Sequence, residues 1–126
     1  MKQILATITV AVTLVASSAS AFDPGHLKML KDIGVCINCD LKGADLKGAK
    51  LEGAKLMDAN LEGAYLKGAY LGGANLSGAY LKGAYLMDAN LGGANLKGAV
   101  INYAIMEGVI FCNTTMPDGS VLYTGC

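Results

Sequence analysis

The motif with the clearest chemical potential in this chain is a CxxC pair, Cys36 and Cys39. Such a pair exchanges disulfides when one thiol has a lowered pKa, as happens at a helix N-terminus. Here the pair follows a predicted helix at 24–33, so the helix dipole is absent or adverse. No strand–helix–strand pattern surrounds it. The sequence therefore favours a structural disulfide, with a thiol–disulfide oxidoreductase as the alternative.

The other titratable residues form no recognisable catalytic set. His26 is the single histidine, and the second cysteine pair, Cys112 and Cys126, lies at the far end of the sequence. A zinc site needs about four Cys or His ligands that converge, and these residues cannot supply such a set. We interpret His26 as an exposed helix residue. The acidic residues fall in outward positions of a repeat, whereas a glycosidase needs two carboxylates across a cleft. We expect no catalytic residue, no metal and no cofactor.

Residues 1–21 have the pattern of a secretory signal peptide. Lys2 precedes an apolar run from Ile4 to Val15, and Ala19-Ser20-Ala21 is a small-residue cleavage site. The alternative is an uncleaved membrane anchor, but the apolar run is short for a span of about 20 residues. We predict cleavage before Phe22, and no stable membrane insertion afterwards.

The remaining chain carries nine lysines against ten acidic residues, with no arginine and no tryptophan. This balance argues against nucleic-acid binding, which relies on basic surfaces, and against a strongly acidic mimic of DNA. An even number of cysteines in a small exported chain is typical of disulfides formed in an oxidising compartment. The expected compartment is the periplasm or the thylakoid lumen, with secretion as a further alternative.

The element that must position these residues repeats every five positions. A leucine recurs at this spacing twelve times from Leu41 to Leu96, and an alanine precedes each by two residues from Ala44 onward. A helix would spread such leucines around its axis, and a strand would send them to alternating faces. One buried side results only if the chain turns a corner in the same sense once per repeat. The predicted core centres are Leu41, Leu46, Leu51, Leu56, Leu61, Leu66, Leu71, Leu76, Leu81, Leu86, Leu91 and Leu96, continued by Ile101, Met106 and Phe111.

Units such as Ala44-Asp45-Leu46-Lys47-Gly48 and Ala59-Asn60-Leu61-Glu62-Gly63 resemble the pentapeptide repeat family, A(D/N)LXX, over about residues 39–113. The resemblance implies an all-β solenoid, a right-handed quadrilateral β-helix with four repeats per coil, in which residues n and n+20 are neighbours. The flanks around Cys36 and Cys112 look like those of cyanobacterial and chloroplast-type members, some of which are exported to the thylakoid lumen or periplasm. The family implies no common activity, and its topoisomerase-protecting members are acidic DNA mimics.

On this implied fold, the two cysteine pairs lie at opposite ends of the solenoid. Coils stack at about 4.8 Å, which puts the ends on the order of 15 Å apart, whereas bridged cysteines need Cα atoms within about 7 Å. We therefore predict disulfides Cys36–Cys39 and Cys112–Cys126. The expected organisation is a signal peptide at 1–21, a helical cap with the CxxC motif at 22–38, repeats at 39–113 and a capping tail at 114–126.

Both ends of such a stack need a cap. Asp23 is a plausible N-cap, Pro24 suits the first helical position and Gly34 can end the helix, so a helix at 24–33 should cover the first coil. At the other end the outward positions Val100, Ile105 and Ile110 become apolar. We expect the tail to fold back over them, and the alternative is an end-to-end dimer.

Several outward positions are expected to stack along the solenoid. Lys42, Glu62 and Lys82 could form a mild ion-pair ladder, and the amides of Asn75 and Asn95 could bond to each other. The candidate partner surface is the aromatic cluster Tyr65, Tyr70, Tyr80 and Tyr85 with Ile105, because exposed aromatics often mark contact surfaces; the alternative is that these side chains only stack and stabilise the coils. We predict an exported, non-catalytic scaffold that is a monomer or an end-to-end dimer and binds a protein whose identity the sequence does not give.

Overall fold

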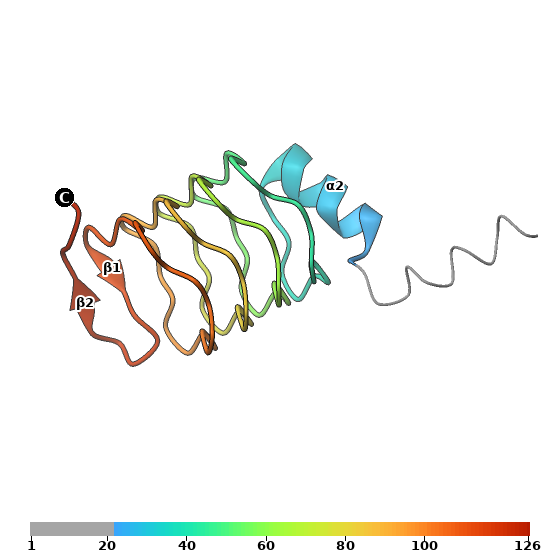
Figure 1. Ribbon diagram of the computed structural model, residues 1–126. Helices are drawn as coiled ribbons and strands as arrows, with labels where there is room; N and C mark the ends of the chain where they lie inside the picture. The colour runs from blue at the N-terminus through green and yellow to red at the C-terminus, as the bar shows by residue number, and fades with distance from the viewer. Residues whose placement is uncertain (1–21) are drawn as a thin grey trace, which may run out of the picture.

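The computed structural model describes residues 22–126, which form one helix followed by a rod of stacked coils (Figure 1). Helix α2 spans Pro24–Ile33 and lies at one end of the rod. Strands β1 (Thr114–Thr115) and β2 (Val121–Leu122) form an antiparallel pair at the other end. The predicted signal peptide lies outside the described residues.

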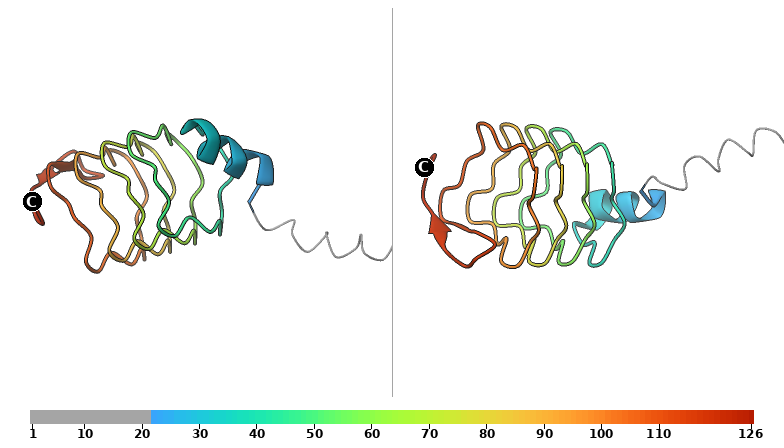
Figure 2. Two further views of the ribbon diagram at one scale, coloured as in Figure 1. Left: turned by 90° about the horizontal axis from the view of Figure 1, so that it is seen from above. Right: turned by 60° about the horizontal axis from the view of Figure 1, so that its bottom comes forward.

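The coils repeat every twenty residues. Parallel bridges join each residue before a core centre to the residue twenty positions later, so four five-residue units complete one turn (Figure 2). The bridges make four columns, which we call ladders. Ladder 1 contains Val35, Lys55, Asn75, Asn95 and Thr115; ladder 2 contains Asp40, Asn60, Tyr80 and Val100; ladder 3 contains Asp45, Tyr65, Tyr85 and Ile105; ladder 4 contains Lys50, Tyr70, Asn90 and Ile110.

Each five-residue unit bonds to the next coil through its backbone. In the unit centred on Leu66, the N–H of Leu66 donates to the carbonyl of Tyr85 at 2.7 Å, and that of Gly68 donates to Met87 at 2.8 Å. A local bond from Ala69 to Leu66 closes the turn at 3.0 Å. Because most backbone groups are bonded between coils, the rod is held together along its whole length although it contains little regular strand.

The core is the predicted line of leucines with small alanines between them. The leucine centres from Leu41 to Leu96 are all buried, at 3% exposure or less. Ile101, Met106 and Phe111, which we expected to be equivalent centres, are only partly buried. The physical reason is that no further coil lies above Ile101 and Met106, and only the short tail lies above Phe111. The bridges and hydrogen bonds also extend the coils from Val35 to Pro117, beyond the repeat limits predicted from the leucines.

The slot two residues after a core centre takes a left-handed conformation, which explains its glycines. Asp58 and Asp88 occupy the same slot, with φ of 56° and 60°, and aspartate tolerates this region better than most residues. A side chain at Gly78 or Gly108, one coil later, would place its Cβ only 2.2 Å from the aspartate Oδ1 below. Any other residue at these two positions would adopt the unfavourable positive φ and would also displace the aspartate side chain below.

Helix α2 caps the N-terminal end of the rod. Asp23 accepts hydrogen bonds from the N–H groups of Gly25 and His26, and Gly34 ends the helix with φ of 69°. The backbone of Asp23 donates to the carbonyl of Asp40 at 3.0 Å, and the N–H of Asp40 donates to His26 Nδ1 at 2.9 Å. His26 does lie on the helix, as we interpreted it, but it is half-buried rather than exposed, and its ring closes the edge of the first coil through the bond from Asp40.

The C-terminal tail covers half of the opposite end. Strand β2 lies over β1, and Thr124 accepts a hydrogen bond from the N–H of Phe111 at 2.9 Å. Gly125 approaches Ile110, so the tail follows the last residues of ladders 1 and 4. Val100 and Ile105 stay 36% and 40% exposed. The expectation that the tail covers all three apolar positions was therefore wrong for these two, because the turn at 117–119 sends the tail back over ladders 1 and 4.

Candidate functional site

The cysteines form two disulfides, Cys36–Cys39 and Cys112–Cys126, in the pairing that the sequence predicts. Cys36 and Cys39 lie in the core, at 0% and 2% exposure. Thiol exchange requires that a thiolate reach a disulfide sulfur, and this burial denies access to the CxxC pair. The burial of Cys36 and Cys39 therefore supports a structural role for their disulfide. In the other disulfide, Cys126 is exposed on the tail.

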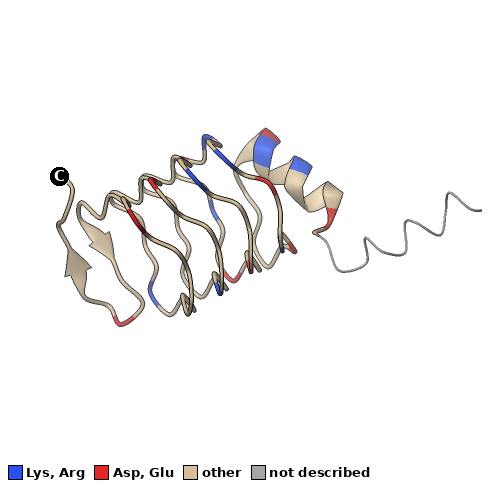
Figure 3. Cartoon of the chain, in the orientation of Figure 1, with Lys and Arg blue, Asp and Glu red and all other residues tan. Residues whose placement is uncertain are grey.

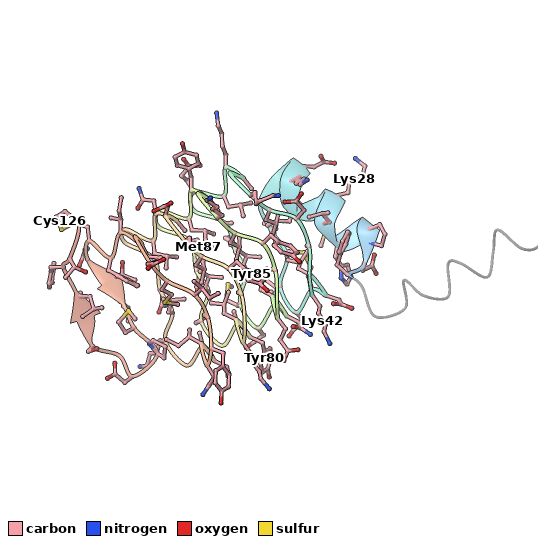
Figure 4. The ribbon with its side chains drawn as sticks, viewed as in Figure 1. Lys28, Lys42, Tyr80, Tyr85, Met87 and Cys126 are labelled. Atoms are coloured by element: carbon pink, nitrogen blue, oxygen red, sulfur yellow. A yellow bond between two sulfur atoms is a disulfide. The ribbon has the colours of Figure 1, made fainter. Side chains whose placement is uncertain are left out.

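The tyrosines occupy three neighbouring ladders: Tyr65 and Tyr85 share ladder 3, and Tyr80 and Tyr70 lie on the flanking ladders 2 and 4. Tyr65 and Tyr85 stack with ring centroids 5.0 Å apart and an interplanar angle of 3°. Figure 4 labels Tyr80 and Tyr85 on neighbouring ladders of the rod. Tyr65, Tyr70 and Tyr80 are 45–48% exposed, and Tyr85 is half-buried. We call the cluster of Tyr65, Tyr70, Tyr80, Tyr85 and Ile105 the aromatic face.

Ladder positions that hold Asp or Asn have a different local role. The expectation that the amides of Asn75 and Asn95 bond to each other along the ladder was wrong. Each amide oxygen instead accepts from the backbone N–H two residues later, at 3.0 and 2.9 Å. Asx side chains favour this short-range bond because it satisfies an N–H that the coil leaves free. The same bond is made by Asp40, Asp45, Asn60 and Asn90.

The tyrosine positions lack this bond, as do the ladder positions that hold lysine, threonine or an aliphatic residue. A tyrosine ring projects away from its own turn, and no hydrogen bond from the following N–H to a tyrosine oxygen is present among the described residues. Each tyrosine thus replaces a side chain that would complete the turn. Hydrogen bonding within the turn therefore does not explain why tyrosines occupy these positions.

Charged side chains are dispersed along the rod and on α2 (Figure 3). Lys42 and Glu62 form the expected ion pair at 3.8 Å; within residues 22–126 Lys82 makes no salt bridge. The exposed Asp118 accepts from the hydroxyl and the N–H of Ser120, and these bonds lower the pKa of its carboxyl below the ordinary value. In the same way, the hydrogen bond to Asp32 raises the pKa of Lys28. Neither group faces a cleft.

A shallow pocket of about 280 Å³ lies between α2 and the first coil. Lys31, Lys47 and Lys50 surround it with Asp45 over an apolar floor. Ligand sites are usually larger and more enclosed. The described residues contain no cluster of three or more metal-ligating side chains. Within the same part of the chain, no helix is both long and apolar enough to cross a bilayer.

The architecture defines the class of protein: a β-helix whose coils contain four five-residue units around a leucine core. The profile of the family described as Pentapeptide repeats matches eight copies, at residues 35–63, 54–93, 64–102 and 79–116. These matches cover more than half of the sequence. The chain belongs to the pentapeptide repeat family, whose fold is a right-handed β-helix and whose members are generally non-catalytic structural or binding modules.

One solved structure agrees with this assignment, and two others are similar to this chain in sequence. A pentapeptide repeat protein from Nostoc PCC 7120 is 32% identical, over 72% of this chain and 77% of its own, with a TM-score of 0.63. HetL from Nostoc sp. strain PCC 7120, described as involved in heterocyst differentiation regulation, is 42% identical over 70% of this chain and 43% of its own, with a TM-score of 0.47. A protein from the Arabidopsis thaliana thylakoid lumen is 28% identical over 64% of this chain and 63% of its own, with a TM-score of 0.24. The comparison with curated proteins found no match.

Proposed function

We propose that this protein is an exported scaffold that binds a protein partner through its aromatic face. The observation that carries the proposal is that tyrosines stand at ladder positions where Asp or Asn would complete the turn. Tyr70 and Tyr80 in addition lack the stacking contact that joins Tyr65 and Tyr85, and nearly half of each side chain is exposed. Exposed aromatics of this kind provide much of the binding energy at protein interfaces.

The aromatic face offers exposed ring surface together with hydroxyl groups. In the stacked pair, each ring covers one face of the other, whereas Tyr70 and Tyr80 have no stacked neighbour in the described rod and are nearly half exposed. Such a surface suits a protein partner that supplies apolar side chains and hydrogen-bond acceptors.

The test separates binding from stability by replacing tyrosine with asparagine. In the variant Tyr70→Asn/Tyr80→Asn, each amide restores the bond to the N–H two residues later, so the melting temperature should stay unchanged or rise. Photo-crosslinking in the native compartment should then lose the partner that the wild-type protein captures. Tyr123→Asn on the exposed tail is the matched control and should retain it. Capture that is equal in the wild type and in the double variant would contradict the proposal.

Export is supported by the apolar N-terminal sequence and by the two disulfides, which are typical of an oxidising compartment. N-terminal sequencing of the purified protein should begin at Phe22. An intact Met1 on the protein in its native compartment would contradict cleavage.

The alternatives are weaker. An oxidoreductase would need an accessible CxxC pair, but Cys36 and Cys39 are buried; an insulin reduction assay with Cys36→Ser as the control would detect this activity. A DNA mimic would need an acidic rod, but the chain has equal numbers of acidic and basic residues.

A further inference from the structure

At the C-terminal end of the rod, a row of backbone N–H groups has no backbone acceptor in the part of the chain that the structure describes, although the equivalent groups one coil earlier are all paired. The N–H groups of Leu81, Gly83, Leu86 and Asp88 all donate to the last coil, at 2.8–3.0 Å for the last three and 2.7 Å for the first. The equivalent donors twenty residues later belong to Ile101, Tyr103, Met106 and Gly108. Among residues 22–126 none of these four has a backbone acceptor. They form an open β edge on ladders 2 and 3.

Apolar side chains accompany this open edge. Ile101 and Met106 point into the core but are only partly buried, and Tyr103 is 83% exposed. Glu107 is the only charged residue from 100 to 110. Unpaired edges next to apolar side chains readily pair with another strand. The open half of the end therefore has the properties of an interface.

The other half of the same end carries an extra layer. The tail lies over ladders 1 and 4, held by the β1–β2 pairing, by the bond from Phe111 to Thr124 and by the Cys112–Cys126 disulfide. Strand β2 pairs only with β1 within the described chain, so its outer edge is free. Val121 and Leu122 on β2 are 40% and 36% exposed. The end is thus a step, one half raised by a layer and the other half lacking it.

We infer that this step is a docking surface for a second copy of the same chain. A two-fold axis in the plane of the end, through the corner between ladders 1 and 2, exchanges ladder 1 with ladder 2 and ladder 4 with ladder 3. The raised half of each copy then lies over the open half of the other. Two tails together complete one shared layer, which pairs the open edge on Ile101–Gly108 with the partner copy's tail.

The step itself selects a second copy over an unrelated peptide. A two-fold interface uses the same patch on both subunits and must be self-complementary. A peptide added to ladders 2 and 3 would pair with the open edge but would leave the outer edge of β2 free. The two-fold arrangement pairs both edges in one contact. It involves the end of the rod, whereas the proposed partner surface is on its sides.

The first experiment measures mass and contact together. Protein expressed from the full sequence, with its N-terminus established by intact mass, should sediment as a dimer that dissociates on dilution. A photo-crosslinking phenylalanine analogue at Tyr103 should link two chains, with the link on residues 120–124 of the second chain. A monomer at every concentration would overturn the inference, as would a dimer whose links from Tyr103 fall on the sides of the rod.

A variant pair separates the interface from the fold. Tyr103→Asp places a charge at the open edge in a slot that already accepts aspartate, since Asp58 and Asp88 have the same positive φ. Losing an aromatic side chain that the dimer would cover and adding a charge should weaken the dimer by about tenfold or more. Gly63→Asp is the matched control, because it occupies the same slot two coils away in open space. It should remain dimeric, and equal dissociation constants for the two variants would refute the shared layer.

Discussion

The two disulfides differ most in their access to solvent, and reduction should therefore open them in a fixed order. Cys36 and Cys39 are buried under α2 and the first coil, whereas Cys126 is exposed and Cys112 partly so. An external thiolate must contact a sulfur atom to react. Under native conditions, dithiothreitol should reduce Cys112–Cys126 while Cys36–Cys39 stays oxidised until the rod itself opens.

The size of the effect follows from the loop that this disulfide closes. A separation of 14 residues corresponds to a loop-closure contribution of about 3 kcal/mol. Without it, the tail is held by the two-residue pairing of β1 with β2 and by the bond from Phe111 to Thr124. Because coils contact only their neighbours, the loss should free the tail and the last coil and leave the first coils folded.

The assay combines alkylation with mass spectrometry and limited proteolysis. Iodoacetamide after mild reduction should label Cys112 and Cys126 first, and a protease should then cleave within 117–126. The double variant Cys112→Ser/Cys126→Ser is the control, because it should show the same cleavage without any reductant. Labelling of Cys36 and Cys39 before the C-terminal pair would refute the reasoning from burial, and so would a tail that resists cleavage after reduction.

Two further predictions concern the core and the N-terminal cap. Leu76→Ala removes a fully buried centre and should lower the free energy of unfolding by about 3–5 kcal/mol, whereas Ile101→Ala at the partly open end should cost clearly less; equal losses in chemical denaturation would contradict the burial gradient. His26→Ala removes the acceptor for the N–H of Asp40 and should cost about 0.5–1.5 kcal/mol. Hydrogen exchange at the Asp40 amide should accelerate while exchange at Tyr85 stays slow, and an unchanged Asp40 rate would exclude this role for the ring.

The sequence predicts most of the rod because its determinants are local. The leucine period requires one corner per five residues, and Asp23, Pro24 and Gly34 specify both limits of α2. The cysteine pairing follows once the coil length is known, since only near neighbours can be joined.

The remaining features depend on contacts between distant segments. The role of His26 could not be predicted, because it depends on where α2 lies over the first coil. The part of the end that the tail covers could not be predicted either, since the turn at 117–119 decides which half of the end the last residues reach. For Asn75, the spacing allows a hydrogen bond to the amide of Asn95 or one to the backbone of its own turn. Only the structure distinguishes the two.

The twenty-residue register has a consequence for how such a rod can change length. Loss of one whole coil shortens it but keeps every outward residue facing its former direction. Loss of a single quintet is different: all leucines would still point inward, yet everything downstream would rotate by about ninety degrees relative to what precedes it. Tyr85 would then leave the column of Tyr65. The leucine core therefore accepts the gain or loss of any number of five-residue units. The arrangement of outward side chains is kept only when four units, or a multiple of four, are gained or lost.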